Sequence, residues 1–171
     1  APGRIPTPNW LLEFSARVNE GDPEAIEANG RWQAGTSGNM MVGQGDVLTT
    51  PLQLANGYAA LANGGTLWLP QLVLQTTDYA SDSNVRVMEQ QAIGQVEMPG
   101  GWRESMLRGF DGVTKTGTAA TVFNGFDQGA CPVSGKTGTA QVNDKNDTSL
   151  FTAYAPTPFD GRTSTIAMAT V

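Results

Sequence analysis

The sequence predicts an α+β fold, with helices in the first two thirds of the chain and an antiparallel β-meander in the last third. Three segments support this prediction: a capped apolar helix over Pro51–Asn63, an amphipathic helix from Trp102 to Phe110, and three extended stretches after Gly135. With 171 residues, 39% hydrophobic and 15% charged, the chain is long enough for one core and does not have a disordered composition.

The N-terminal segment predicts an extended arm followed by a short helix. Residues Ala1–Trp10 are rich in proline, which a helix interior does not tolerate, so we expect an extended surface arm. Further on, Asp22 is a good N-cap and Pro23 fits the first helical position. We therefore expect a helix over Pro23–Ala28.

The predicted helix over Pro51–Asn63 has clear signals at both ends. Thr50 offers a hydroxyl cap, Pro51 suits the first turn, and Gly64 and Gly65 favour termination. Apolar residues recur at helical spacing and surround much of the circumference, as in a helix inside a larger domain. We expect this helix to be largely buried.

The region between the two long helices is predicted to be mostly extended. Thr66–Leu74 is an extended segment that Pro70 restricts to a sheet edge, Asp78–Asn84 is a polar loop, and Val85–Glu89 is a short strand. After the amphipathic helix, a second helical piece is expected over Thr118–Phe123.

We expect the meander to consist of three strands with polar turns between them: Lys136–Val142, Ser149–Ala155 and Thr163–Val171. The last strand is apolar or small on both faces, which favours a central position in the sheet. Because the sequence stops inside this strand, we expect the chain to be part of a larger domain.

The composition excludes several kinds of site. A net charge of −6 does not provide the basic patch that nucleic-acid binding requires, and no apolar run approaches the length of a membrane span. The absence of histidine excludes a Ser-His-Asp triad within the chain and a His-ligated metal. The single Cys131 is interpreted as a packed or partly exposed thiol and not as a nucleophile, and we expect neither a metal nor a cofactor.

The stretch around Lys136 carries the strongest chemical signal. On a strand, Lys136 and Gly138 would share one face, and Thr137 and Thr139 the other. Gly138 would leave room for a ligand, while the lysine and a threonine hydroxyl could meet its anionic end. An open strand edge could also hydrogen-bond a peptide-like ligand.

The wider string Gly135–Gln141 resembles the K-T-G motif of the class B penicillin-binding proteins, elongation-type peptidoglycan D,D-transpeptidases. Other blocks resemble the same family and occur in its order: Gly3–Pro8 with Trp10, Asn39–Gly45, Thr50–Ala55, Ala62–Gly65, and Phe151 with Tyr154–Pro156. Together these blocks cover nearly the whole chain.

The resemblance implies a fold and a reaction. The fold is that of the penicillin-binding and serine β-lactamase-like enzymes: an antiparallel sheet with helices on both faces and an all-helical lobe beside it. In the reaction, a serine attacks the penultimate D-Ala carbonyl of a stem peptide, D-Ala leaves, and an amine of a neighbouring stem resolves the acyl-enzyme. β-Lactams acylate the same serine.

The resemblance also implies partners and a location. The partners are peptidoglycan stem peptides, β-lactams and, in the full-length protein, a membrane-embedded glycan polymerase. The location is the extracytoplasmic face of the bacterial cell membrane, with an anchor outside this chain.

By the same resemblance, four residues would carry the site. Lys136 would supply positive potential, and Thr137 and Thr139 would hold the carboxylate of the substrate or the β-lactam. The N–H of Thr139 would be one oxyanion-hole donor. Gly138 would let the ligand lie along the strand.

The chain departs from the family at the nucleophile. No serine is followed by lysine three residues later, since Ser83 and Ser105 have arginine there, which cannot act as a neutral base. We therefore expect the chain to be the C-terminal portion of one transpeptidase domain, with the S-x-x-K and S-x-N motifs outside it. The alternative is a catalytically inactive, penicillin-binding-protein-like module that binds the wall or a partner. An upstream S-x-x-K would exclude that alternative.

Two further motif matches are interpreted as coincidental. Ser37–Asn39 spells S-x-N but stands directly before the G-Q-G block, so a catalytic role is not expected. Lys115–Ala119 repeats Lys136–Ala140 letter for letter, but only the second copy continues to Gln141 and into a strand pair. We assign the active-site role to the second copy and regard the first as accidental.

Overall fold

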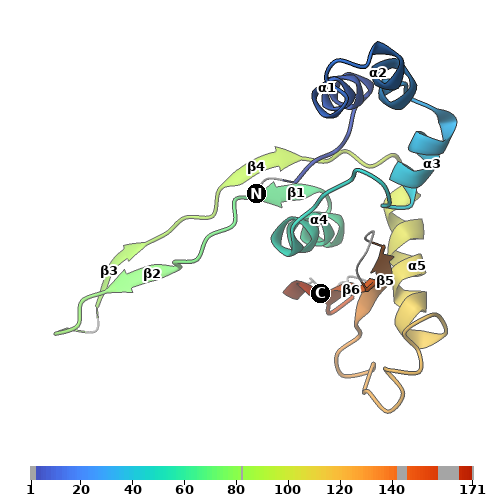
Figure 1. Cartoon of the computed structure of the whole chain (residues 1–171). Helices are drawn as coiled ribbons and strands as arrows, with labels where there is room; N and C mark the ends of the chain where they lie inside the picture. Colours follow the sequence, from blue (N-terminus) through green and yellow to red (C-terminus); the bar gives the residue numbers. More distant parts are fainter. Residues whose placement is uncertain (1–2, 82, 142–145, 158–165, 171) are drawn as a thin grey trace. The chain divides into compact units, whose positions relative to one another are not determined.

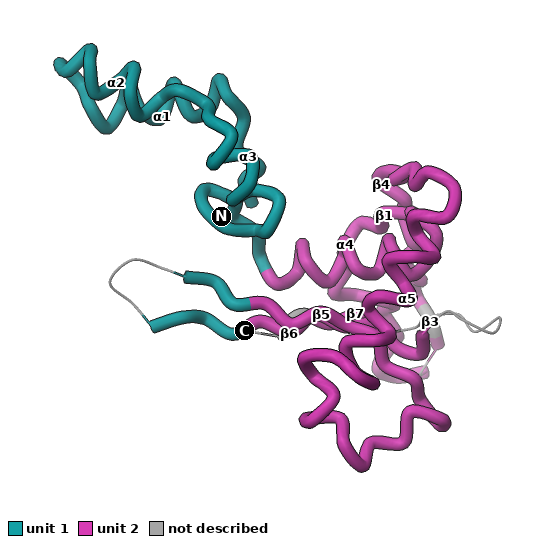
Figure 2. The backbone as a smooth tube through the Cα atoms, turned by 90° about the vertical axis from the view of Figure 1, so that its right-hand side faces the viewer, with its two compact units in different colours: residues 1–50, 139–149 teal, residues 51–138, 150–171 magenta. Residues whose placement is uncertain are grey.

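The computed structural model describes residues 3–81, 83–141, 146–157 and 166–170. The chain divides into two compact units, coloured separately in Figure 2. Unit 1 contains Ala1–Thr50 and Thr139–Ser149, and unit 2 contains Pro51–Gly138 and Leu150–Val171.

Unit 1 contains three helices: α1 (Pro8–Val18), α2 (Pro23–Gly30) and α3 (Ala34–Met41). The expected helix from Pro23 is confirmed and extends two residues further than predicted. The expected arm over Ala1–Trp10 is wrong from Pro8 onward. Thr7 caps a helix there by accepting from the N–H of Trp10, and a first-turn proline is compatible with a helix.

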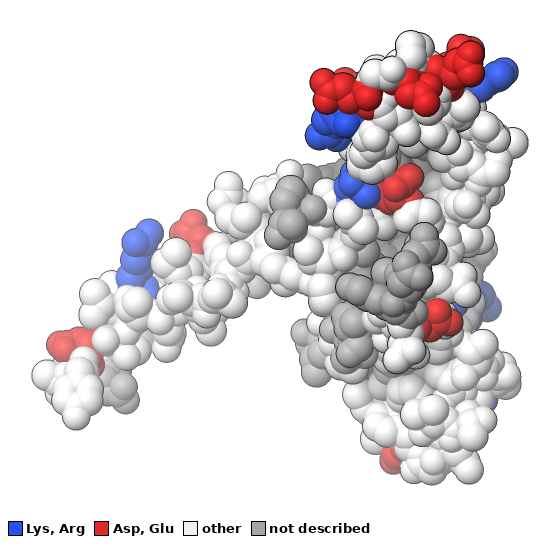
Figure 3. Space-filling view, in the orientation of Figure 1, with Lys and Arg blue, Asp and Glu red and all other residues white. Residues whose placement is uncertain are grey.

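The first two helices pack closely against each other. The hydroxyl of Ser15 on α1 is buried and donates to the carbonyl of Ile26 on α2 at 3.0 Å. A Cβ added at Gly30 would lie 3.0 Å from Leu12 Cδ1 and 3.2 Å from Leu12 Cα, so a larger residue here would have to displace α1 slightly. Figure 3 shows acidic and basic side chains gathered over this helix pair.

Unit 2 contains the two predicted long helices, α4 (Pro51–Asn63) and α5 (Trp102–Lys115). Arg103 of α5 donates to the carbonyls of Leu61 and Ala62 at 2.8 and 2.5 Å, which satisfies acceptors that the end of a helix leaves unpaired. The expectation that α4 is largely buried holds only for its C-terminal half. Residues Ala60–Ala62 are buried, whereas Leu52 is 61% exposed.

The meander is confirmed as a three-stranded sheet in the order β5 (Ser134–Ala140), β6 (Thr148–Ala155), β7 (Ile166–Thr170). The expected central position of the last strand is wrong among the described strands, because β6 lies in the middle. Residues Thr152–Ala155 of β6 are all buried, so both faces of this strand are covered. The predicted turns over residues 143–147 and 156–161 fall largely outside the described residues.

The core of unit 2 joins both long helices to the sheet. Its buried members are Leu61 and Ala62 of α4, Leu107 of α5 and Tyr154 of β6. Partly buried apolar residues pack around them: Tyr58, Met98, Phe110 and Ala167. Thus α4 and α5 are fixed against the two strands that follow β5.

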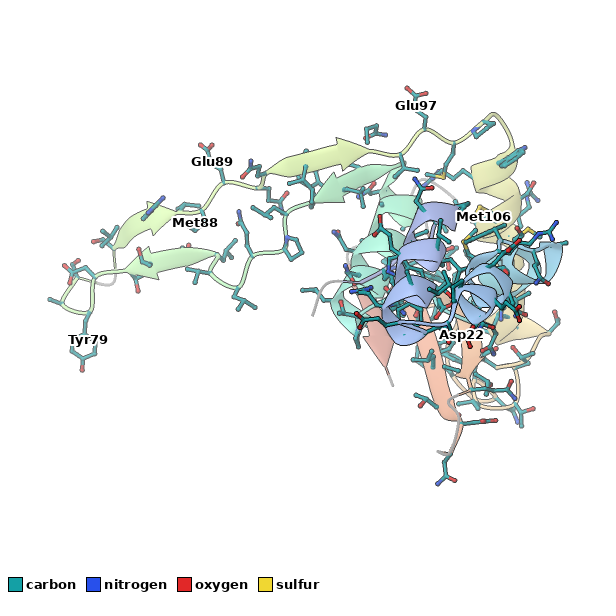
Figure 4. The ribbon with its side chains drawn as sticks, turned by 45° about the horizontal axis from the view of Figure 1, so that its top comes forward. Asp22, Tyr79, Met88, Glu89, Glu97 and Met106 are labelled. Atoms are coloured by element: carbon teal, nitrogen blue, oxygen red, sulfur yellow. The ribbon has the colours of Figure 1, made fainter. Side chains whose placement is uncertain are left out.

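Between α4 and α5 the chain forms a two-stranded arm, which Figure 1 shows with its tip at β2 and β3. Strand β1 (Thr66–Trp68) pairs antiparallel with β4 (Ala92–Gln95), and β2 (Gln75–Thr77) pairs with β3 (Asn84–Val87). The predicted extended segment Thr66–Leu74 is a strand only over Thr66–Trp68, and the predicted strand near Val85 is confirmed. Strands β2 and β4 were not predicted. Figure 4 shows Tyr79 at the tip, pointing away from the arm.

The predicted helix over Thr118–Phe123 is wrong, because this segment forms successive turns. The N–H groups of Ala120 and Val122 each donate to the carbonyl three residues earlier. Gly117 directly precedes the segment and lies against the end of α5, where a Cβ would be 2.9 Å from Val113 Cα. The chain therefore turns away from the helix axis instead of continuing it.

Candidate active site

The K-T-G motif lies on β5, as predicted, within a strand that begins two residues earlier at Ser134. Lys136 and Thr139 are exposed, while Thr137 and Gly138 are half-buried. Among the described strands, β5 has a neighbour on one side only, so its other edge is open. Such an edge offers backbone donors and acceptors to an extended ligand.

The side chain of Lys136 lies along its own strand. Its ammonium group donates to the carbonyl of Thr137 at 2.6 Å, and no ion pair joins it to a carboxylate among the described residues. Lys115 differs, because its ammonium group pairs with Asp111 one turn earlier on α5 at 2.8 Å. Lys136 is therefore the better placed of the two lysines to meet a ligand anion.

The first K-T-G-T-A copy forms the C-terminal cap of α5. The N–H groups of Thr116 and Gly117 both donate to the carbonyl of Gly112, at 2.9 and 2.8 Å. The two copies thus have different backbones, a helix end and a strand, although their letters are identical. The strand copy has the geometry that an edge-binding site requires.

The first copy nevertheless touches the second. The hydroxyls of Thr118 and Thr137 lie 2.8 Å apart and form a hydrogen bond in which either can be the donor. The interpretation of the first copy as accidental therefore overlooks this contact with Thr137, a predicted substrate-binding residue. Sequence spacing alone carries no signal for such a contact.

Hydrogen bonds from three other segments hold the start of β5 in place. The hydroxyl of Thr114 donates to the carbonyl of Val133 at 2.7 Å, and the amide oxygen of Gln128 accepts from the N–H of Val133 at 2.8 Å. One residue later, the buried hydroxyls of Ser134 and Thr157 are 2.6 Å apart. These bonds set where the K-T-G strand starts.

Gly135, directly before the lysine, has the tightest surroundings of the glycines in β5. A Cβ there would lie 2.7 Å from the carbonyl oxygen of Thr152 and 2.8 Å from Cζ of Phe151. At Gly138 the nearest atom, Leu150 Cβ, would be 3.4 Å away, which is ordinary contact. Close packing against β6 therefore requires glycine at Gly135 more than at Gly138.

Within unit 1, the G-Q-G block contacts the last threonine of the motif. Gly43 and Gly45 adopt positive φ angles of 77° and 74°, which glycine tolerates best, and they hold Gln44 between them. The amide nitrogen of Gln44 donates to the carbonyl of Thr139 at 3.1 Å. Two blocks that share the family resemblance are thus joined by a hydrogen bond.

The S-x-N triplet Ser37–Asn39 lies inside helix α3. The hydroxyl of Ser37 accepts from the indole N–H of Trp32 at 2.8 Å. The contact is internal to unit 1 and supplies a structural reason for this serine.

Comparison with known proteins identifies the family. A family model described as "Penicillin binding protein transpeptidase domain" matches residues 9–171. The chain belongs to the penicillin-binding protein transpeptidase family. Two curated relatives confirm the resemblance to the elongation-type class B members.

Two curated relatives are similar to this chain. Penicillin-binding protein 2A of Bacillus subtilis is 30% identical over 166 residues, which cover 86% of this chain and 23% of the relative. Peptidoglycan D,D-transpeptidase MrdA of Acinetobacter baumannii is 30% identical over 143 residues, covering 82% and 18%. The chain thus spans only about a fifth of the length of these relatives.

Solved structures support the fold. Penicillin-binding protein A from M. tuberculosis, solved as an imipenem acyl-enzyme complex, matches 94% of this chain and 39% of its own with a TM-score of 0.66 and 19% identity. Penicillin-binding protein 2B from Streptococcus pneumoniae R6 matches 99% of this chain and 30% of its own, with a TM-score of 0.61 and 19% identity. The predicted α+β transpeptidase fold is therefore confirmed.

The residues that the structure describes include no group of three acidic, cysteine or histidine side chains that could hold a metal ion. Over the same residues, none of the helices has both the length and the apolar character needed to cross a bilayer.

Proposed function

We propose that this chain supplies the K-T-G part of a peptidoglycan D,D-transpeptidase that cross-links stem peptides through a serine acyl-enzyme. The observation that carries the proposal is the motif on β5: an exposed lysine and exposed threonine on an open-edged strand, in a chain of the transpeptidase family.

Each residue of the motif has a physical role in this proposal. The ammonium group of Lys136 attracts the carboxylate of the acyl donor, and the hydroxyls of Thr137 and Thr139 donate hydrogen bonds to it. The N–H of Thr139 stabilises the oxyanion that forms when the serine oxygen bonds to the carbonyl carbon. The open edge beside Gly138 holds the donor backbone in extended form.

The nucleophile belongs to a segment outside these residues. The support is chemical: no serine in the chain has a lysine three residues later that could take its proton. The fraction of the relatives that this chain spans, 23% and 18%, leaves ample room for that segment in proteins of their length.

The proposed partners follow from the same assignment. Stem peptides are the proposed substrates, supported by a relative whose name is peptidoglycan D,D-transpeptidase. β-Lactams are the proposed inhibitors, supported by a fold neighbour solved as an imipenem acyl-enzyme. A membrane-embedded glycan polymerase as partner and an anchored, extracytoplasmic location complete the proposal, on the family resemblance.

The test is to react the full-length protein with a fluorescent penicillin and to map the labelled peptide by mass spectrometry. We expect one adduct per protein, on a serine that precedes lysine by three residues and lies outside residues 1–171. Heat-denatured protein is the control for nonspecific labelling. A failure to label would favour the inactive binding module, and an adduct on a serine within this chain would overturn the assignment of the nucleophile.

A further inference from the structure

The contact between the two K-T-G-T-A copies suggests a role for the first copy. Thr118 is exposed, and its hydroxyl lies 2.8 Å from that of the half-buried Thr137 on β5. Both residues lie in unit 2. The contact therefore brings a residue with no assigned role to one that the proposed function places on the substrate.

The backbone holds Thr118 in place on both sides. Gly117 packs against the last turn of α5 so closely that a Cβ there would be 2.9 Å from Val113 Cα. Ala119 is buried, and its N–H donates to the carbonyl of Val113 at 3.0 Å. Packing on both sides thus holds the backbone from which the Thr118 side chain extends.

Which of the two threonine hydroxyls donates the proton in this bond determines what Thr137 can offer to a ligand. Each hydroxyl has one proton to donate and two lone pairs that accept. If Thr137 donated to Thr118, it would have no proton left for an anion. If Thr118 donates, Thr137 keeps its proton, and the two bonds in series strengthen each other.

We propose that Thr118 is a positioning residue that turns the O–H of Thr137 toward the carboxylate of the acyl donor. The proposal rests on the proposed function, because it needs Thr137 to bind that carboxylate. Thr118 acts through Thr137 and makes no contact of its own with the reacting bond. The first motif copy would then support the second.

The test measures acylation of the full-length protein by benzylpenicillin and by its methyl ester, which lacks the anionic carboxylate. Thr118→Val removes the hydroxyl at nearly constant shape, and we expect the second-order rate with the acid to fall about fivefold to tenfold, as for loss of one modest hydrogen bond. The rate with the ester should change little. Thr118→Ser, which restores a hydroxyl, should recover most of the rate.

Two controls separate positioning from a general structural effect. Thr116→Val alters an exposed threonine of the same loop whose hydroxyl is 3.4 Å from the Gly112 carbonyl, and it should acylate normally. In a Thr137→Val background, Thr118→Val should add almost nothing, because the hydroxyl it orients is gone. Thr118→Ala provides a second variant without the hydroxyl. The thermal unfolding midpoints of all variants should match that of the wild type.

The outcomes distinguish this inference from the proposed function. If Thr137→Val slows the acid reaction while both Thr118 deletions leave it unchanged, the positioning role is wrong and the proposed function stands. Equal losses with acid and ester, or fully additive losses in the double variant, would also overturn the positioning role. If the wild type is not acylated, the proposed function fails. If the wild type is acylated and Thr137→Val has no effect, the role assigned to Thr137 fails.

Discussion

The hydroxyl of Thr114, in the last turn of α5, donates to the backbone carbonyl of Val133, one residue before β5 begins, at 2.7 Å. Thr114 is 2% exposed, so the donor end of this bond is shielded from water. It ties the end of a core helix to the start of the strand that carries Lys136. The position of the motif therefore depends on a residue far from the motif in sequence.

Thr114→Val should lower the free energy of unfolding by about 1–3 kcal/mol, because the Val133 carbonyl would lose a buried donor that valine cannot replace. Urea denaturation of the full-length protein, followed by circular dichroism, measures the effect. The exposed Thr116 is the matched control, and Thr116→Val should change stability little. Equal changes in the free energy of unfolding for the two substitutions would mean that the Thr114 bond does not stabilise the fold.

The two glycines of β5 should respond differently to alanine. At Gly135 an added methyl group would collide with the Thr152 carbonyl and the Phe151 ring, so Gly135→Ala should lower the melting temperature strongly and expose the start of the strand. At Gly138 the added methyl would make ordinary contact with Leu150, so Gly138→Ala should fold normally. Thermal unfolding of both variants tests this contrast, and a larger loss at Gly138 would contradict it.

A charge on the inner face of α4 should disrupt the core. Tyr58 packs against Phe110 with ring centroids 5.3 Å apart, and it borders the buried cluster around Leu61. Tyr58→Asp would leave an unpaired carboxylate there and should cost several kcal/mol of stability. Leu52→Asp places the same charge on the exposed start of the helix and serves as the control. Similar melting temperatures for the two variants would show that α4 faces water on both sides.

The buried Tyr154 predicts a loss of stability at alkaline pH. Burial raises the pKa of its hydroxyl from 10.0 to about 12. Between these values the unfolded chain releases the proton while the folded chain keeps it, so the free energy of unfolding falls as pH rises from about 10 to 12. Tyr154→Phe removes this contribution.

The measurement is the free energy of unfolding of wild type and Tyr154→Phe at several pH values from 8 upward. The wild type should lose more stability than the variant above about pH 10. Near neutral pH the variant should be nearly as stable, because the hydroxyl has no hydrogen-bond partner among the described residues. Parallel pH profiles would mean that Tyr154 ionises in the folded protein as readily as in the unfolded chain.

The sequence predicted those elements whose signals are local. Helix α4 has a proline at its first position and glycines after its end, and α5 has its apolar residues at helical spacing. The strands β5 and β6 stand out by composition between polar turns. Helix α3 was missed because Gly35 and Gly38 weaken the helical pattern. Its start is held instead by hydrogen bonds from the Gln33 N–H to the Thr36 hydroxyl and from the Trp32 indole N–H to the Ser37 hydroxyl.

The features that could not be predicted depend on contacts between distant residues. Strand β4 acquires its strand character by pairing with β1, and its own four residues, Ala92–Gln95, give a weak signal. The steric need for glycine at Gly135 comes from Phe151 and Thr152 across the sheet. The bond between Thr118 and Thr137 crosses nineteen positions of sequence and follows from how α5 ends.

The central claim is that the strand copy of the motif, and not the helix-end copy, carries the active-site lysine. The most direct measurement is the second-order rate of β-lactam acylation of the full-length protein carrying Lys136→Ala or Lys115→Ala, with Thr139→Val as a further variant. Lys136→Ala should slow acylation at least about a hundredfold while the protein stays folded, by analogy with loss of an oxyanion donor, and Thr139→Val should also slow it. Lys115→Ala should react almost as fast as the wild type, because it removes only a partly exposed ion pair with Asp111 within α5. Slow acylation of the Lys115→Ala variant, together with a wild-type acylation rate for Lys136→Ala, would contradict the account.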